Sequence, residues 1–136
     1  MIFVDTGAWF AVGVRNDPDH AAAMVWLEQN RDPLVTTDYI LAETITLIRM
    51  RDKTARGHRL AVRTATSLLR GEAAMLEKVN ADDLERALSI FRTYRDHLFS
   101  FVDCTSFVVM ERLGITEAFA FDRHFDEYPG INRVPR

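Results

Sequence analysis

The sequence predicts an α/β fold, a three-layer α/β/α sandwich around a short, mainly parallel central sheet. Short apolar runs rich in β-branched and aromatic residues, such as residues 2–4 (IFV), alternate with longer segments of helical periodicity. Wholly apolar runs of this length are typical of strands that are buried on both faces, as in parallel sheets. Strands that alternate with helices imply parallel βαβ units with right-handed crossovers. At 136 residues, with no change of composition that would mark a linker, we expect a single domain over residues 1–136.

In the first half of the chain, we expect strands at residues 2–4 and 34–36. Asp5 or Thr6 can cap a helix over residues 7–14, and a second helix is predicted after Pro18. Asp38 is the expected cap of a third helix over residues 39–52. The apolar residues of that helix cover most of its circumference, which predicts a largely buried helix with Glu43 in its middle. We expect the basic stretch DKTARGHRL to separate it from a helix over residues 60–70.

In the second half, residues 74–79 (AMLEKV) form the third predicted strand. Asp82 or Asp83 is expected to begin a helix whose apolar residues recur at i, i+3, i+4 and i+7. Another helix is predicted over residues 100–113, followed by Gly114 at its C-terminal cap. The segment ITEAFAFD is the fourth predicted strand, with Asp122 at its carboxyl end, and residues 131–134 form a short last strand.

The overall composition excludes several classes of protein. A net charge of −3 lacks the basic excess of a protein that holds nucleic acid through phosphate contacts alone, although an enzyme with clustered acids remains possible. The single cysteine, Cys104, permits no internal disulfide, and we expect it to be a buried apolar group rather than a nucleophile. The N-terminus has no basic segment, and no apolar run approaches ~18 residues. We therefore expect a cytoplasmic protein that does not contact a membrane.

Four separated acids carry the functional prediction. Asp5 and Asp122 each follow a predicted strand, so they fall at the carboxyl edge of a parallel sheet, where ligands bind. Asp103 lies near the start of a helix, and Glu43 lies on a helix that can face the same edge. Carboxylates ~4 Å apart repel each other by ~4 kcal/mol at an effective dielectric constant near ~20. Either some of these acids are protonated, or a cation compensates them.

The donor set indicates which cation would suit such a site. Oxygen ligands without an organised His or Cys favour Mg²⁺ or Mn²⁺ over Zn²⁺. A metal of this kind lowers the pKa of a bound water and polarises phosphoryl oxygens. The predicted chemistry is therefore phosphodiester hydrolysis.

Four segments containing these acids resemble those of a known family: FVDTGAWFA, LAET, SFVDCTSF and AFAFDRHF. Over essentially the whole chain, the sequence resembles the PIN-domain nucleases, especially the VapC-type toxins of bacterial toxin–antitoxin pairs. The resemblance implies that Asp5, Glu43, Asp103 and Asp122 form the acidic metal-binding quartet, with Thr6 as the small hydroxyl residue beside the first acid. It also implies a Mg²⁺- or Mn²⁺-dependent endoribonuclease that acts on RNA, forms a homodimer and is inhibited by a small cognate antitoxin.

Individual residues also have purely structural interpretations. Asp5 and Asp103 are good helix caps, and Asp122 suits a turn. Asp126 is either a fifth, outer ligand or a solvated loop acid, and His124 is expected to be exposed in a polar loop. The basic cluster at residues 49–59 either contacts RNA phosphates or forms a solvated face.

Two other functions compete with the nuclease. The first is a non-catalytic PIN-like binding module whose acids engage basic side chains of a partner protein. The second is a phosphatase on a related α/β architecture, which commonly needs a second Asp two positions after the first. Gly7 occupies that position here, which disfavours a phosphatase.

Overall fold

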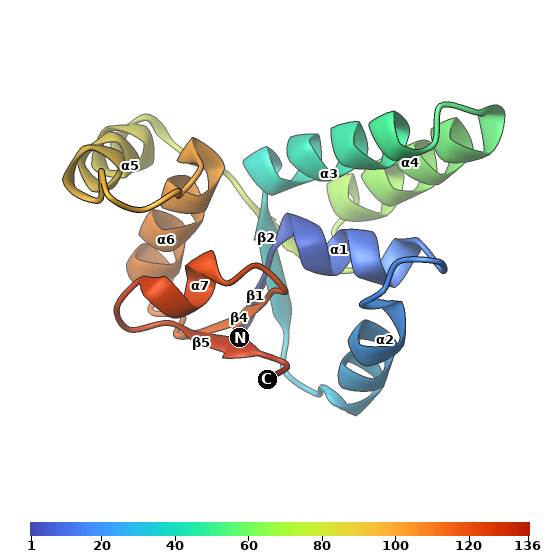
Figure 1. The fold of residues 1–136 in the computed structure, drawn as a ribbon, viewed down its shortest axis with the longest axis horizontal. Coiled ribbons are helices and arrows are strands. Elements are labelled where there is room, and N and C mark those ends of the chain that lie inside the picture. The colour runs from blue at the N-terminus through green and yellow to red at the C-terminus, as the bar shows by residue number, and fades with distance from the viewer.

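The computed structural model describes all 136 residues and contains one parallel sheet (Figure 1). Its five strands have the order β3-β2-β1-β4-β5, and every neighbouring pair is parallel. They are β1 (Ile2–Val4), β2 (Leu34–Thr37), β3 (Met75–Glu77), β4 (Glu117–Phe119) and β5 (Asn132–Val134). The prediction of a short, mainly parallel sheet is confirmed, and the sheet is in fact entirely parallel.

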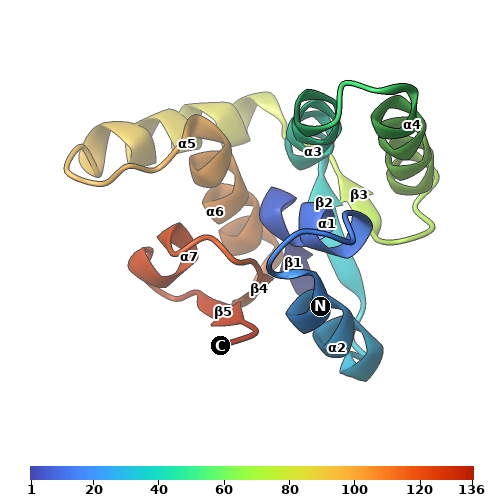
Figure 2. The same cartoon turned by 45° about the vertical axis from the view of Figure 1, so that its right-hand side comes forward.

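Helices flank this sheet and divide into two groups. The first group comprises α1 (Thr6–Gly13), α2 (His20–Gln29), α3 (Asp38–Arg51) and α4 (Ala55–Leu69). The second comprises α5 (Ala81–Thr93), α6 (Phe101–Leu113) and the short α7 (His124–Glu127). Figures 1 and 2 show the first group on one side of the sheet and the second group on the other. No helix has the combination of length and apolar character that crossing a membrane requires.

The two groups follow from the strand order. The chain steps outward from β1 to β2 and β3, then returns across the sheet to β4 on the other side of β1. Because crossovers between parallel strands are right-handed, steps in opposite directions place their helices on opposite faces. The order of winding therefore reverses between β1 and β4, and ligands of open α/β sheets bind at such a switch point.

The core is formed by the inner strands and by α6. All three residues of β1 are buried, and Phe3, Phe107, Phe119 and Phe125 have no exposed surface. Eight consecutive residues of α6, from Asp103 to Met110, are buried. This helix is therefore enclosed on nearly all sides, and it brings a carboxylate into the protein interior at its first turn.

Two helix caps differ from the expected ones. Thr37, not Asp38, caps α3, because its Oγ1 accepts a hydrogen bond from the Ile40 amide at 3.1 Å. The Asp38 side chain accepts instead from the Val79 amide at 2.9 Å, so it ties α3 to the segment after β3. Asn80 caps α5, where the prediction was Asp82 or Asp83. Asp83 completes a capping box with Asn80, a motif in which each residue bonds the backbone of the other.

The third predicted helix is less buried than expected. Only Ile40, Thr44 and Ile48 of α3 are buried, at intervals of four residues, so the helix presents one stripe to its neighbours and exposes the rest. The separation between α3 and α4 is also shorter than predicted, since α4 already begins at Ala55. Gly57 permits this tight connection, because a Cβ there would overlap the Asp52 carbonyl.

The fourth strand ends earlier than predicted. It spans Glu117–Phe119, so Asp122 follows the strand at a distance of three residues instead of ending it. The neighbouring β5 ends at Val134, whose carbonyl accepts from the Ala120 amide at 3.0 Å. Residues 121 and 122 then leave the sheet and turn toward α7.

Candidate active site

Asp5 is placed at the switch point by β1. Its backbone amide donates to the carbonyl of Phe119 at 3.0 Å, which continues the β1–β4 pairing by one residue. Its side chain caps α1 by accepting from the Gly7 amide at 3.4 Å. The residue is only 6% exposed. The prediction that Asp5 caps the first helix is confirmed, and the cap holds the carboxylate at the carboxyl edge of the sheet.

Asp103 enters the site from the first turn of α6. It is the third residue of that helix, and Ser100 is the cap. The Ser100 hydroxyl accepts from the Asp103 amide at 3.0 Å, and Asp103 Oδ2 accepts from the Ser100 amide at 2.9 Å. This capping box fixes the carboxylate while leaving Oδ1 without a hydrogen bond in the structure.

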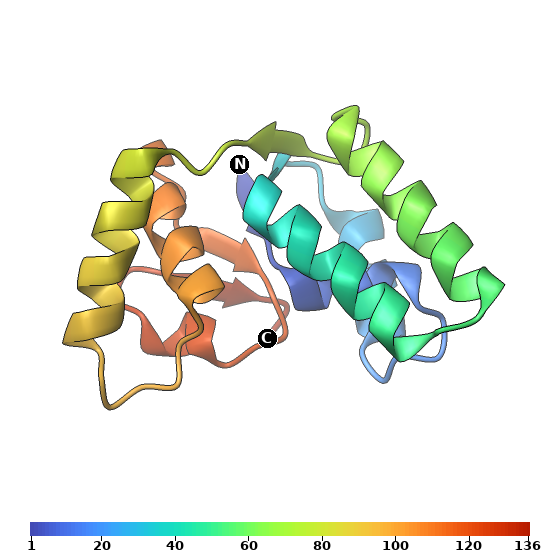
Figure 3. The same ribbon diagram turned by 90° about the horizontal axis from the view of Figure 1, so that it is seen from above.

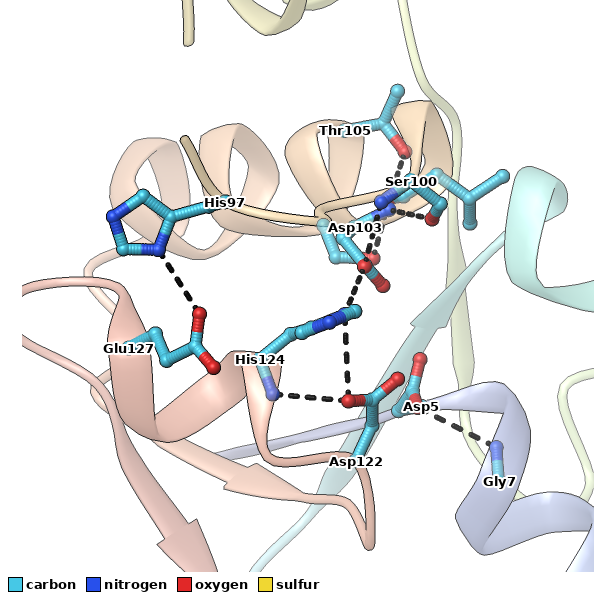
Figure 4. A network of polar contacts seen from close by, with 11 residues as sticks. Asp5, Gly7, His97, Ser100, Asp103, Thr105, Asp122, His124 and Glu127 are labelled. Carbon is cyan, nitrogen blue, oxygen red and sulfur yellow. Dashed lines mark hydrogen bonds and ion pairs between the residues drawn. The ribbon is translucent and has the colours of Figure 1, made fainter. Parts of the chain in front are cut away.

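His124 joins Asp103 to Asp122. Its Nδ1–H donates to Asp103 Oδ2 at 2.9 Å and lies 3.4 Å from Asp122 Oδ1. Its backbone amide donates to the same Asp122 oxygen at 2.9 Å. In Figure 4 the carboxylates of Asp5, Asp103 and Asp122 lie on the same side of the His124 ring as its tip. One ligand atom from each of Asp103, Asp122 and His124 lies within 4.8 Å of the others.

The expectation that His124 is an exposed loop residue is wrong. The residue begins α7, is half-buried, and contacts two of the four predicted acids. The available signal was the spacing Asp-x-His directly after a strand, since an Asp side chain often accepts from the backbone two residues further on. The sequence suggested a site with oxygen ligands alone. The structure adds the imidazole of His124 to it.

Burial and mutual repulsion change the acidity of the site. Burial, and then the Asp103 carboxylate, raises the pKa of Asp5 to about 7. Burial also raises the pKa of Asp103, opposed by its hydrogen bonds from Ser100 and His124. Burial alone would lower the pKa of His124, but the hydrogen bond to Asp103 and the charge of Asp122 outweigh it and raise that pKa. Near neutral pH the site therefore holds fewer negative charges than its acids could carry.

Glu43 is the least constrained member of the predicted quartet. It lies on α3 and is half-buried, and its side chain has no hydrogen bond or ion pair. It nevertheless lies close enough to Asp5 for its charge to contribute to the raised pKa of Asp5. The sequence predicted a largely buried helix with Glu43 in its middle. The structure shows a carboxylate that is free to turn toward the other acids.

The supporting residues named from the sequence differ in their surroundings. Thr6 is buried beside Asp5, and its Oγ1 has no hydrogen-bond partner. Asp126 accepts from Arg133 Nε at 2.8 Å, so its charge is compensated elsewhere. Cys104 is buried, and burial, with a contribution from Asp103, raises the pKa of its thiol to about 11. A thiol of that pKa remains protonated at neutral pH and is a poor nucleophile.

These residues fit a hard divalent cation. The buried carboxylates of Asp5 and Asp103 repel each other, Asp103 keeps one oxygen free, and a buried Thr6 hydroxyl lacks a partner. Burying an unpaired hydroxyl costs about 1–3 kcal/mol. A hydrated cation would compensate the carboxylates and give that hydroxyl a water to bond.

Comparison with known proteins agrees with this architecture. The model of the PIN domain family matches residues 2–131. The chain therefore belongs to the PIN-domain family, and the resemblance noted in its four motifs is confirmed at that level.

Within that family the chain is a homologue of the VapC ribonuclease toxins, and it is an endoribonuclease by that homology. It is 38% identical over 125 residues to the 23S rRNA-specific endonuclease VapC20 of Mycobacterium tuberculosis, covering 92% of each protein. Ribonuclease VapC26 of the same species is 28% identical over 128 residues, covering 91% of this chain and 89% of the relative.

Solved structures show the same fold. The crystal structure of M. tuberculosis VapC20, described as a sarcin–ricin loop cleaving toxin, matches with a TM-score of 0.88 at 34% identity, covering 96% of this chain and 97% of that one. A toxin–antitoxin complex from Klebsiella pneumoniae matches with a TM-score of 0.68 at 14% identity, covering 97% and 96% of the two chains. At that identity the second likeness concerns the fold alone.

Proposed function

We propose that this chain hydrolyses RNA phosphodiester bonds with Mg²⁺ or Mn²⁺ held by Asp5, Asp103 and Asp122. The observation that carries the proposal is the gathering of Asp5, Asp103 and Asp122 from three separate elements, with the pKa of Asp5 raised to about 7 by burial and by Asp103, with a further contribution from Glu43. A structural cap or turn needs no such convergence. Like charges gathered in a buried place are typical of metal-dependent catalysis.

Each residue has a distinct role in this proposal. Asp5 and Asp103 bind the cation from fixed positions, because helix caps hold them. His124 restrains Asp103 and Asp122 through its Nδ1–H and leaves Nε2 available to a ligand. Glu43 either binds the cation directly or orients the attacking water. Thr6 bonds a water of the same hydration shell.

When bound, the divalent cation activates water and stabilises the charge that develops on the phosphoryl oxygens. Asp5 contributes to such a site in its ionised form, so its raised pKa links binding to pH. Cleavage is expected to leave a 5′-phosphate and a 3′-hydroxyl. We include in the proposal that the chain acts in the cytoplasm as a homodimer and as the toxin of a pair with a small antitoxin. Its homology to the VapC toxins supports the last point.

The test is a cleavage assay on an RNA oligonucleotide that reproduces the sarcin–ricin loop, with a scrambled loop for comparison. The wild-type protein is expected to cut in Mn²⁺ or Mg²⁺ and not in excess EDTA. Asp5→Asn, Asp103→Asn and Asp122→Asn should lose more than the roughly 10- to 100-fold that follows loss of an outer-sphere partner. Asp126→Asn is the matched control, because its side chain pairs with Arg133 outside the cluster. Undiminished cleavage by Asp5→Asn, or cleavage in EDTA, refutes the proposal.

The binding module remains a second candidate, because one basic side chain, His124, already lies between two of the acids. A partner's Lys or Arg could use the same carboxylates in place of a metal. Calorimetric titration with Mn²⁺ at neutral pH separates the two functions. Binding that Asp103→Asn abolishes supports the nuclease, whereas absence of binding by the wild-type protein supports the module.

A further inference from the structure

A concave region lies at the opposite end of α1 from Asp5. It is a cavity of about 710 Å³ lined by the end of α1, the segment that follows it, the end of α3 and the start of α4. Figures 1 and 3 show the α1–α2 connection and the α3–α4 connection at the same end of the molecule, away from α7. Buried Phe10 and Ile48 contribute to its lining. No residue of the acidic cluster takes part in this cavity.

Four arginines surround this cavity: Arg15, Arg51, Arg56 and Arg63. All four are exposed, and none forms a hydrogen bond or an ion pair within the chain. Only Arg51 has a defined contact, with its guanidinium 5.7 Å from the centre of the Phe10 ring. Elsewhere in the protein Arg112 and Arg133 pair with carboxylates. Unpaired guanidinium groups that surround one cavity are suited to an anionic ligand.

The acids of this cavity are occupied by local contacts. Asp17 Oδ1 accepts from the Asp19 amide at 2.9 Å. Asp52 Oδ1 accepts from the amide and the hydroxyl of Thr54, and the hydroxyl contact is the first cause of a lowered Asp52 pKa. These carboxylates shape the turns that carry the arginines, and neither forms an ion pair with them.

A neighbouring cavity extends the basic region along α4. It has a volume of about 540 Å³ and shares Arg56 and Arg63 with the first, adding His58 and Arg59 and no acid. Residues 49–70 contain seven of the seventeen Lys and Arg residues of the chain and one of its twenty Asp and Glu residues. This segment therefore carries a charge of +6, and the rest of the chain carries −9.

We propose that these two arginine-lined cavities bind the phosphate backbone of the substrate RNA at a distance from the bond that is cut. This proposal rests on the proposed function and adds a second surface with which the enzyme binds its RNA substrate. An acidic active site on a chain of net charge −3 repels RNA. A separate basic surface supplies the attraction that the catalytic end lacks.

The spacing suits a single strand that reaches both places. Helix α1 has eight residues, with Asp5 capping one end and Gly13 lining the cavity at the other. Eight residues of α-helix span ~12 Å, a distance that a single strand of a few nucleotides can cover. Two adjoining cavities that share arginines suit the regular repeat of phosphates, and the apolar surface of Phe10 and Ile48 suits a ribose or a base. These features favour RNA over an acidic protein segment.

The test measures binding without cleavage. The probe is a fluorescein-labelled single-stranded RNA of about 12 nucleotides in EDTA, observed by fluorescence anisotropy at several salt concentrations. The variant is the double substitution Arg56→Ala with Arg63→Ala, which alters both cavities. The matched control is Arg70→Ala with Arg92→Ala, which removes the same charge from exposed positions outside them. A labelled oligoglutamate peptide serves as a second probe.

Loss of two phosphate contacts reduces the steepness of the plot of log K against log salt concentration by about 1.4. This corresponds to a loss of roughly 25-fold in affinity near 0.1 M salt. The double variant is expected to show this loss and the control variant is not. Equal RNA binding by the two variants overturns the proposal. If only the binding of oligoglutamate depends on Arg56 and Arg63, the ligand of the cavities is an acidic protein segment. Metal-dependent cleavage by the wild-type protein is measured on the same RNA. Arginine-dependent binding without cleavage contradicts the proposed function alone, and cleavage with arginine-independent binding contradicts this inference alone.

Discussion

Replacing Asp5 by Asn is expected to stabilise the metal-free protein, and to do so more strongly as the pH rises. The carboxylate is buried, and its pKa is raised from 3.8 to about 7 by burial and by Asp103. The folded state thus binds a proton more tightly than the unfolded state does. Stability from this group is present at low pH and is lost as the pH rises from about 4 to about 7. Asn keeps the size of the side chain and its capping ability, and it removes the charge.

The size of the effect follows from the shift in pKa. A change of about 3 units corresponds to about 4 kcal/mol between the fully protonated and fully ionised limits. Between about pH 5 and pH 8 the wild-type protein should lose about 3 kcal/mol of this contribution, which the variant does not lose. For a domain of this size, that difference corresponds to roughly 10 °C in the midpoint of thermal unfolding.

The measurement is urea denaturation of both proteins in excess EDTA at a series of pH values from about 5 to 8. Asp32→Asn is the matched control, because that Asp is exposed and its carboxylate forms no hydrogen bond. The difference in unfolding free energy between Asp5→Asn and wild type should grow with pH, while Asp32→Asn follows the wild-type curve. A difference that stays constant across the series, or that shrinks as the pH rises, would show that Asp5 is not a strained buried carboxylate.

The other predictions concern the metal, a buried ion pair and a tight turn. The affinity for Mn²⁺ should increase from about pH 6 to pH 8 with release of protons, since Asp5 must ionise to bind. Calorimetry in buffers of different ionisation enthalpy measures the affinity and the number of protons released. An affinity that does not change with pH contradicts the assignment of Asp5 as a metal ligand. Arg112→Ala should cost about 3–5 kcal/mol in urea denaturation, because it leaves the fully buried Asp83 without its charged partner at 2.9 Å. Arg86→Ala breaks the more exposed pair with Glu111 and should cost less than about 1 kcal/mol, so equal losses would exclude this explanation. Gly57→Ala should destabilise the protein by about 1–3 kcal/mol because its Cβ meets the Asp52 carbonyl, whereas Gly13→Ala has room and should not reduce thermal stability.

Local patterns account for what could be predicted from the sequence. The strands are visible as apolar runs, and three acids stand beside strand or helix ends, so their common edge follows from the rules of parallel sheets. Asp5 as a helix cap needed only its immediate neighbours.

Contacts between distant elements account for what could not be predicted. The position of His124 depends on α6 meeting the turn before α7, which brings together residues 21 positions apart. Asp38 bonds the Val79 amide, a contact over 41 positions, and so leaves the cap to Thr37. The arginine cavity combines Arg15 with residues of α3 and α4, whereas the sequence displayed only the cluster at residues 49–59. In each case the deciding partner is fixed by packing and not by local preference.

The central position of β1 has a consequence for the growing chain. The first strand to be synthesised is the middle one of the sheet, and it remains unpaired on one side until β4 is made. Asp5 follows β1 and Asp122 follows β4, so this pairing brings together two acids that are 117 positions apart in the sequence. A ribosome that has not yet made β4 therefore carries a chain without the complete proposed site. A truncated product that lacks β4 would keep Asp5, Glu43 and Asp103 but would lack Asp122, so the proposed site needs nearly the whole polypeptide.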